Sequence, residues 1–238
     1  MNVSAAKGND SGPAMIELHG IQRSYRVGDE TVHALRGIDL TIRAGEYVSI
    51  MGPSGSGKSS MLNILGLLDR PNAGHYALDG RDVTGLSDDE LARVRREKIG
   101  FVFQFFHLVP RLTAAENIAL PMVLAGIDPA ERQRRLATLL AQYGLEHRAH
   151  HRPDQLSGGQ CQRVAIARAM SMQAPVILAD EPTGNLDRHT GQEVIALLEG
   201  PHAAGGTLVM VTHDVQLGNR AHRRLRMVDG QLVSDERS

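Results

Sequence analysis

The chain has 238 residues, enough for one large domain or two small ones. Its 26 basic and 27 acidic side chains nearly cancel, which argues against a protein that mainly coats DNA or RNA, because such proteins carry a strong basic excess. It has four Phe, four Tyr and no Trp, so the core has to be built from aliphatic side chains. The longest nearly unbroken apolar run, 61–68, is too short for a membrane span, which needs about 20 residues.

The first thirteen residues are small and polar, and we expect a disordered tail over 1–13. No apolar segment of a secretion signal occurs there. The single cysteine, Cys161, excludes an internal disulfide and fits a reducing compartment. We therefore expect a soluble, cytosolic chain without a membrane span of its own.

Apolar runs separated by turns predict the strands. Turns at Gly28-Asp29 and Ala44-Gly45 divide the first part of the chain. Most of the later runs are continuously apolar, as expected for strands buried on both faces of a parallel sheet. The predicted strands are 16–27, 31–42, 46–52, 99–104, 175–181, 207–212 and 224–230.

Helix signals lie between these runs, and the alternation predicts an α/β fold. Residues 105–155 contain no convincing strand, so we predict an inserted helical subdomain at about 105–160 within one domain over 14–238. The predicted helix boundaries are capping boxes at Ser87 with Glu90 and at Thr113 with Glu116, a start at Asp128-Pro129 and an end at Gly144.

The segment GPSGSGKS, 52–59, matches the phosphate-binding loop G-x-x-x-x-G-K-[ST] between an apolar strand and a helix. Its glycines let successive backbone N–H groups turn toward phosphate oxygens, and the helix N-terminus adds a positive dipole end. Lys58 can reach the β- and γ-phosphates, and the Ser59 hydroxyl can bind Mg²⁺. A flexible Gly/Ser loop is the plain alternative, and a dinucleotide fingerprint lacks its final glycine. The predicted binding residues are Gly52, Pro53, Ser54, Gly55, Ser56, Gly57, Lys58, Ser59 and Ser60.

Two carboxylates end the strand VILADE at Asp180 and Glu181. The first suits Mg²⁺ coordination, and the second can act as general base or orient the attacking water. An acidic strand end alone is ordinary. Together with the phosphate loop it favours a nucleotide-hydrolysing site.

A second glycine-rich helix start, LSGGQ, contains Ser157, Gly158, Gly159 and Gln160. It can be a simple helix cap or a second anion-binding terminus. One nucleotide needs only one phosphate cradle. Two cradles in one chain indicate that each nucleotide lies between two protomers.

In this order, GPSGSGKS, LSGGQ, VILADE and the VTHD at 211–214 resemble an ABC ATPase from about Ile16 to about Val233. The resemblance implies a P-loop NTPase core with a mostly parallel sheet, an N-terminal antiparallel β subdomain and the helical insertion. It implies ATP and Mg²⁺ as cofactors. It also gives four single residues a role: Tyr25 would stack on adenine, Gln104 would sense the nucleotide, Asp187 would cross a dimer interface and His213 would contact the γ-phosphate.

Each of these four residues also has a plain structural interpretation. Tyr25 can be an ordinary strand aromatic, and single polar residues at strand ends usually just satisfy backbone groups. On the resemblance, the predicted catalytic residues are Lys58, Gln104, Glu181 and His213, and the predicted metal ligands are Ser59, Gln104 and Asp180.

The stretch 103–122, the sequence around Tyr25 and the short tail after Gly230 are similar to the lipoprotein-release and macrolide-exporter branch of the family. That branch implies a transmembrane permease, a second copy in an ATP-sandwich dimer, and a place on the cytoplasmic face of the inner membrane. We expect a complete ATPase whose permease is a separate chain and which binds no nucleic acid. The alternatives are a soluble ABC-type ATPase acting on nucleic acid or ribosomes, and a cell-division ATPase of the same branch.

Cys161 departs from the family pattern, in which Gln or Glu commonly follows LSGGQ. It can be a tolerated substitution, or it can alter the loop, and a thiol at a helix N-terminus can have a lowered pKa. We interpret the histidines in EHRAHHRP, 146–153, as part of a polar loop rather than a metal site. We interpret the basic run at 93–98 as a solvated helix face.

Overall fold

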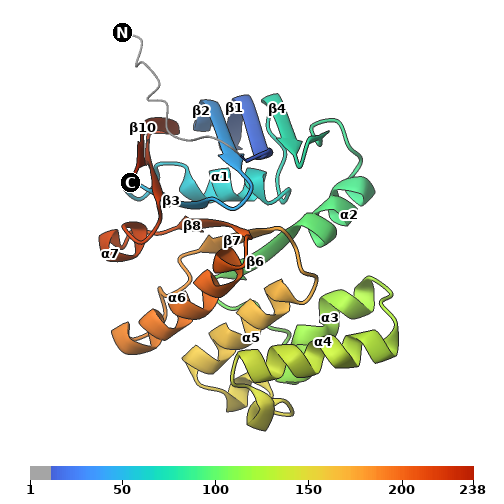
Figure 1. Cartoon of the computed structure of the whole chain (residues 1–238). Coiled ribbons are helices and arrows are strands. Elements are labelled where there is room, and N and C mark those ends of the chain that lie inside the picture. The colour runs from blue at the N-terminus through green and yellow to red at the C-terminus, as the bar shows by residue number, and fades with distance from the viewer. Residues whose placement is uncertain (1–11) are drawn as a thin grey trace.

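The computed structural model describes residues 12–238, which form two sheets with helices around them (Figure 1). The strands are β1 (Ala14–Val27), β2 (Glu30–Arg43), β3 (Tyr47–Met51), β4 (Ala73–Leu78), β5 (Arg81–Asp82), β6 (Ile99–Phe103), β7 (Val176–Asp180), β8 (Thr207–Val211), β9 (Arg223–Val228) and β10 (Gln231–Arg237). The helices are α1 (Lys58–Leu65), α2 (Asp88–Lys98), α3 (Ala114–Leu124), α4 (Pro129–Gln142), α5 (Gly158–Met170), α6 (Arg188–Ala203) and α7 (Val215–Gly218), with 3-10 turns at Glu146–Arg148 and Pro153–Gln155.

The central sheet has six strands in the order β10-β9-β3-β8-β7-β6. Five of them are parallel, and β10 is an antiparallel edge strand. Neighbours are in register at the ends of the strands, where Ile50 pairs with Val211 and Asp180 also pairs with Val211. Since parallel strands end at the same edge, the segments that follow β3, β7 and β8 meet there.

Apolar side chains point to both faces of this sheet, and both faces are buried. The continuously apolar strands predicted this burial. Ile50, Leu178 and Val209 pack in one cluster with α1 and the antiparallel sheet. Ala179 and Met210 face the other way and pack with α3, α5 and α6. The α/β prediction is confirmed, and α1 and α5 lie on opposite faces of the sheet (Figure 1).

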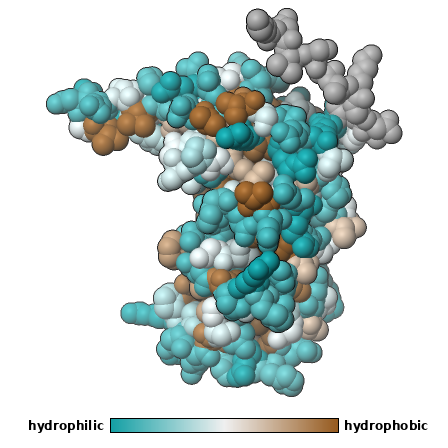
Figure 2. Space-filling view, turned by 90° about the vertical axis from the view of Figure 1, so that its left-hand side faces the viewer, coloured by the Kyte–Doolittle hydropathy of each residue, from teal (hydrophilic) through white to brown (hydrophobic). Residues whose placement is uncertain are grey.

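The second sheet is antiparallel, in the order β2-β1-β4-β5, and forms the top of the molecule in Figure 1. The predicted antiparallel N-terminal part is thus confirmed. This part of the molecule projects sideways as an arm that carries hydrophobic patches (Figure 2). At the end of the β1–β2 hairpin, Val27 and Val32 are 62% and 48% exposed.

Three strands escaped the sequence prediction. β4 contains Gly74 and His75, and β5 is only Arg81–Asp82, so neither has an apolar run to mark it. β10, QLVSDER, was interpreted as a tail, but it pairs with β9 as an exposed edge strand. β5 and β10 are edge strands whose side chains are mostly exposed, so they carry no run of buried apolar residues.

Helix boundaries agree closely with the sequence signals. The capping boxes at Ser87 with Glu90 and at Thr113 with Glu116 both form, and Asp128 caps α4. Gly144 follows the end of α4 with a φ of 65°, a left-handed conformation that glycine adopts without strain. Residues 105–157 consist of helices, 3-10 turns and loops.

Residues 1–11 of the predicted disordered tail lie outside the described residues. Gly12 and Pro13, also predicted as tail, are anchored: their carbonyl oxygens accept hydrogen bonds from Arg43 and from the Ala44 N–H. The bond from Ala44 to Pro13 lies next to the Ala14–Arg43 pair and continues the pairing of β1 with β2, so backbone hydrogen bonding extends the ordered chain toward the N-terminus. Over residues 12–238, none of the helices combines the length and the hydrophobicity that a bilayer crossing requires.

Candidate nucleotide-binding site

The phosphate loop joins β3 to α1, as predicted. The Lys58 Nζ atom folds back over it and donates hydrogen bonds to the carbonyl oxygens of Gly52 at 2.9 Å and Pro53 at 2.8 Å. Gly57 caps α1 with a φ of 98°, which only glycine adopts readily. The helix therefore begins directly at the loop and leaves its first N–H groups for an anion.

The loop is clamped between the two sheets, which explains two of its glycines. A Cβ atom on Gly52 would lie 2.1 Å from the Met227 carbonyl oxygen, and one on Gly57 would lie 2.3 Å from the Ala34 carbonyl oxygen. Inside the loop, Ser56 is 2% exposed and its hydroxyl has no hydrogen-bond partner. The loop is thus rigidly held and keeps an unsatisfied polar group.

Asp180 ends β7 close to the phosphate loop. Burial raises the pKa of its carboxyl, the neighbouring Glu181 charge adds to the rise, and the positive charge of Lys58 opposes it. A partly buried carboxylate that is costly to ionise favours a cation beside it. Ser59, the first residue after Lys58, brings a hydroxyl to the same region.

Glu181 is fixed in an unusual position. Its φ is 44°, which is strained for a residue with a side chain, and its N–H donates to the Val211 carbonyl oxygen at 2.9 Å. Its two carboxylate oxygens contact His213 Nδ1 at 2.8 Å and the Thr212 hydroxyl at 3.2 Å. The Glu181 side chain is 18% exposed and that of His213 75%, so the pair runs from the end of the sheet to the surface.

Gln104 lies against the loop that follows β7. Its side-chain N–H donates to the Asn185 side-chain oxygen at 3.4 Å, and the Asn185 amide donates back to the Gln104 carbonyl oxygen at 2.9 Å. Asp187 caps α6, and its carboxylate accepts hydrogen bonds from Thr190 and His189; the Thr190 hydrogen bonds lower its pKa most. Gln104 and Asp187 therefore fix the part of this loop that leads into α6.

Tyr25 reaches from β1 to the helix of the phosphate loop. Its hydroxyl lies 3.4 Å from the Ser60 hydroxyl and donates to Asp69 at 2.9 Å. The ring is only partly buried. The ring thus lies beside the helix that follows the predicted phosphate loop, and the Arg23 guanidinium lies over one of its faces.

The second glycine-rich helix start caps α5. The Ser157 hydroxyl accepts a hydrogen bond from the Gln160 N–H at 3.3 Å, and the Gln160 side chain accepts one from the Ser157 N–H at 3.0 Å. A Cβ on Gly159 would lie 2.4 Å from Thr190 Cγ2, so this glycine allows α5 to approach α6. The cap interpretation and the anion-site interpretation are compatible, because the exposed terminus can serve both.

Sequence reasoning missed two residues of α5 that hold the loop after β6. Gln162 is fully buried and its side-chain N–H donates to the Pro182 and Phe103 carbonyl oxygens at 2.7 and 3.3 Å. Arg168 donates to the carbonyl oxygens of Phe106 and His107. A glutamine on the apolar side of the helix QCQRVAIARAM is the signal that identifies Gln162.

The suggestion that the Cys161 thiol has a lowered pKa is wrong. The side chain is buried at 6% exposure, and burial raises its pKa. The sulfur lies 3.5 Å from the Pro153 carbonyl oxygen. Desolvation outweighs the helix dipole here, because a thiolate would lose its hydration. As for the histidines at 146–153, no metal-binding cluster of His, Cys, Asp or Glu occurs within the described residues.

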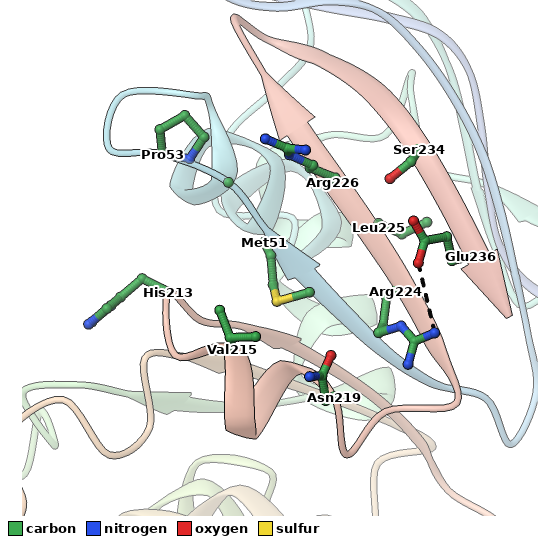
Figure 3. Close-up of a pocket in the computed structure, with 11 residues that line it drawn as sticks. Met51, Pro53, His213, Val215, Asn219, Arg224, Leu225, Arg226, Ser234 and Glu236 are labelled. Atoms are coloured by element: carbon green, nitrogen blue, oxygen red, sulfur yellow. Dashed lines mark ion pairs between the residues drawn. The ribbon is translucent and has the colours of Figure 1, made fainter. Parts of the chain in front are cut away.

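A cavity of about 910 Å³ opens beside the phosphate loop, between β3, α7, β9 and β10 (Figure 3). Met51 and Pro53 line it on the loop side, and Arg226 projects next to Pro53 in the view. Arg224 on the far wall pairs with Glu236 at 3.8 Å, a weak contact across the β9–β10 strands. The phosphate loop is thus reachable from the surface on this side.

Comparison with known proteins finds similarity over nearly the whole chain. Residues 35–184 match the ABC transporter family. The macrolide export ATP-binding/permease protein MacB of Marinobacter nauticus is 53% identical over 93% of this chain and 34% of its own length. The pyoverdine export ATP-binding/permease protein PvdT of Pseudomonas fluorescens is 52% identical over 93% of this chain and 34% of its own length. The chain thus spans about a third of the length of these curated relatives.

Solved structures agree with the sequence match. The dimeric post-hydrolysis structure of the ATP-binding cassette MJ0796 bound to ADP and Pi matches with a TM-score of 0.87 and 46% identity, over 94% of this chain and 98% of that one. The cbiO1 structure from Clostridium perfringens matches with a TM-score of 0.82 at 27% identity. The family match over residues 35–184 and the agreement of the fold with solved cassettes show that the chain belongs to the ABC transporter family.

Proposed function

We propose that this chain binds ATP with Mg²⁺ and hydrolyses it, with the catalytic residues as predicted from the sequence. The main observation behind this proposal is the hydrogen bond between Glu181 and His213. Glu181 has a strained backbone conformation and lies next to Asp180, which is near the phosphate-loop residue Lys58. Lys58 and the N–H groups at the start of α1 bind the phosphates. Lys58 exchanges its hydrogen bonds to the Gly52 and Pro53 carbonyl oxygens for bonds to the β- and γ-phosphates. Tyr25 stacks on the base.

In the reaction, water attacks the γ-phosphorus, and the bond to the bridging oxygen breaks so that ADP leaves. Glu181 accepts the proton of the attacking water or orients it. His213 holds the Glu181 carboxylate through Nδ1 and presents its other ring nitrogen toward the γ-phosphate. Gln104 connects this site to the loop that precedes α6.

The residues fit a magnesium ion that arrives with the nucleotide. Mg²⁺ prefers oxygen ligands and usually keeps only one or two protein ligands beside phosphates and waters. Ser59 and Asp180 supply a hydroxyl and a carboxylate. The raised pKa of Asp180 shows that the positive charge of Lys58 does not fully balance its negative charge. Gln104 is the further predicted ligand. Bound there, the ion would neutralise charge that develops on the phosphates.

We further propose that two copies close on two nucleotides. Within one chain, the phosphate loop and the Ser157–Gln160 helix start belong to helices on opposite faces of the sheet. The two cradles therefore suit a head-to-tail dimer in which each nucleotide contacts one cradle from each protomer. The relative MJ0796 is described as a dimer bound to ADP and Pi, which supports this arrangement.

The partner we propose is a membrane permease, with the chain bound at the cytoplasmic face of the inner membrane. Support comes from the relatives, whose names join ATP-binding and permease functions, and from exposed apolar side chains on the helical part, at Phe105, Val109, Val123 and Leu124. We propose that the exported substrate is a hydrophobic compound, a class to which the macrolides in the MacB name belong. Lipoproteins, peptides and a cell-division role are the other substrates and tasks that this branch suggests.

One variant tests the hydrolytic site. Glu181→Gln keeps the size of the side chain and removes the base, so hydrolysis should fall by about a hundredfold or more while ATP binding persists. Glu193→Gln, which alters an exposed ion pair of α6, is the matched control. Near-normal turnover by Glu181→Gln would remove Glu181 from the proposed role.

The partner is tested separately by purification from detergent-solubilised membranes and from the soluble fraction. A stoichiometric membrane protein with the chain supports the permease proposal. Ribosomes or DNA in its place would favour the soluble ATPase instead. Replacing Phe105 and Leu124 by Ser should release the membrane protein without reducing ATP hydrolysis by the isolated chain.

A further inference from the structure

Tyr25 is held by two other side chains, Arg23 and Asp69. The Arg23 Cζ atom lies 4.5 Å from the centroid of the Tyr25 ring, within cation–π range. The Arg23 Nε atom lies 2.8 Å from Asp69 Oδ2, and the same oxygen accepts the Tyr25 hydroxyl at 2.9 Å. The three side chains form a closed triangle that fixes both the face and the end of the ring.

Asp69 links this triangle to the phosphate loop. It follows α1, the helix that begins at Lys58, and its N–H donates to the Asn63 carbonyl oxygen at 3.2 Å. Three residues later, Asn72 fastens the same segment to β1: its side-chain oxygen accepts the Ser24 N–H at 2.7 Å. The segment after α1 therefore sets how far the Tyr25 ring stands from the phosphate loop.

The triangle matters because the hairpin end around Tyr25 has little core packing. Val27 and Val32 near its tip are exposed, whereas Arg23 and Asp69 are only 21% and 23% exposed. An aromatic side chain that is not packed into a core samples several rotamers. The polar contacts of the triangle thus replace the packing that orders aromatic rings in a core.

We propose that Arg23 and Asp69 are positioning residues that hold the Tyr25 ring ready to stack on the base of a nucleoside triphosphate. This inference rests on the proposed role of Tyr25 in binding ATP. A ring that is already ordered binds a base more tightly, because less conformational entropy is lost on binding. Neither residue has to touch the phosphates, so only the base-dependent part of the affinity depends on them.

The test compares two ligands by calorimetry on the full chain with Mg²⁺: ATP, and inorganic tripolyphosphate, which has no base. Arg23→Gln should weaken ATP binding about fivefold and leave tripolyphosphate binding within about twofold. Arg23→Lys keeps the cation and should recover part of the loss. Arg26→Gln, an exposed arginine on the same strand, is the matched control and should change neither affinity.

Asp69→Asn provides a second variant in case Arg23→Gln folds poorly, and it should also weaken ATP binding selectively. At saturating ATP, kcat should be unchanged in each folded variant, since the triangle acts on binding alone. A tighter ATP complex in Arg23→Gln, or an equal loss for both ligands, would overturn the positioning role.

Tyr25→Ala separates this inference from the proposal beneath it. If Tyr25→Ala leaves ATP binding unchanged, the base does not stack on this ring and the proposed role of Tyr25 fails. If Tyr25→Ala weakens ATP binding but Arg23→Gln does not, the ring is used and the positioning role alone is wrong. If Tyr25→Ala and Arg23→Gln each weaken ATP binding, adding Arg23→Gln to Tyr25→Ala should cause no further loss of ATP affinity.

Discussion

Asp180 and Glu181 are adjacent, yet the fold treats their carboxylates differently. Asp180 is held where ionisation is costly, because burial and the charge of Glu181 both raise its pKa. Glu181 turns away through a left-handed backbone conformation and finds partners in Thr212 and His213. The two adjacent carboxylates thus have different environments. Such a difference commonly allows one carboxylate to bind a metal ion and the other to accept a proton.

Asp180 provides the first prediction. A carboxyl whose native pKa lies above its unfolded value makes the ionised folded state costly. That cost is present at neutral pH and disappears as the pH falls below the unfolded pKa of about 3.9. Asp180→Asn should therefore raise the melting temperature at pH 7 by about 1–3 °C and abolish Mg²⁺-dependent hydrolysis.

The control for this experiment is Asp82→Asn. Backbone and side-chain hydrogen bonds from Thr84 lower the pKa of Asp82, so its replacement should not stabilise the protein. Differential scanning calorimetry at pH 7 and pH 4 measures both variants. A melting temperature of Asp180→Asn at or below wild type at pH 7 contradicts the assigned cause of the shift.

Cys161 gives a second prediction at the residue scale. Because the thiol is buried and its pKa is raised, we expect a water-soluble thiol reagent to label the folded chain at least about tenfold more slowly than the unfolded chain. Cys161→Gln should keep ATPase activity within a few-fold. The single cysteine makes the labelling rate unambiguous, and rapid labelling of the native protein would contradict the burial argument.

At the scale of elements, α5 connects the parts of the site. Its first turn is the glycine-rich start, Gln162 in its second turn joins the segments after β6 and β7, and Arg168 near its end holds the loop at Phe106 and His107. A rotation or shift of α5 therefore has to move the loop that contains Gln104. This helix is the element through which the second cradle and the nucleotide site are mechanically linked.

Gln162→Leu tests how much the buried glutamine stabilises this junction. Leucine fills the space but leaves the Pro182 and Phe103 carbonyl oxygens without their donor, so we expect a loss of about 1–3 kcal/mol in the free energy of unfolding. Gln142→Leu, at an exposed position of α4, is the control and should cost far less. Urea unfolding of both variants is the measurement, and equal stabilities would show that the buried glutamine is dispensable.

For the whole molecule, the central feature is that two phosphate cradles lie on helices of opposite faces of one sheet. A single chain cannot bring them to one nucleotide without breaking the core between them. Association of two copies is the arrangement that uses both. In the dimer proposed above, Ser157 lies at the interface between the copies rather than in the ATP site of its own chain.

Ser157→Arg in the Glu181→Gln background tests this arrangement. The arginine adds bulk and charge at the exposed start of α5, so ATP-dependent dimers seen by size-exclusion chromatography should disappear. ATP binding to the phosphate loop should stay within about threefold, because the substitution lies on the other cradle. Thr138→Arg, on the exposed side of α4, should leave the dimer intact. A persistent dimer in Ser157→Arg would place the interface elsewhere.

The sequence by itself determined the local features: the turn glycines, the three helix caps at Ser87, Thr113 and Asp128, the buried strands, and the order of the motifs. Each of these depends on neighbours within a few residues, which is why pattern reasoning found them. The polar edge strands β5 and β10 escaped it because they carry no local apolar signal, and β4 escaped it because Gly74 and His75 interrupt its apolar residues.

Only the tertiary structure decided what depends on distant contacts. It placed Glu181 against His213 across two strands, closed the triangle of Arg23, Tyr25 and Asp69 over residues far apart in sequence, and buried the Cys161 thiol. Hydrogen bonds, ion pairs and desolvation act over a few ångströms in space, whatever the separation along the chain. Packing therefore set the partners and the burial of these side chains. Their residue types and spacing had already predicted a nucleotide site.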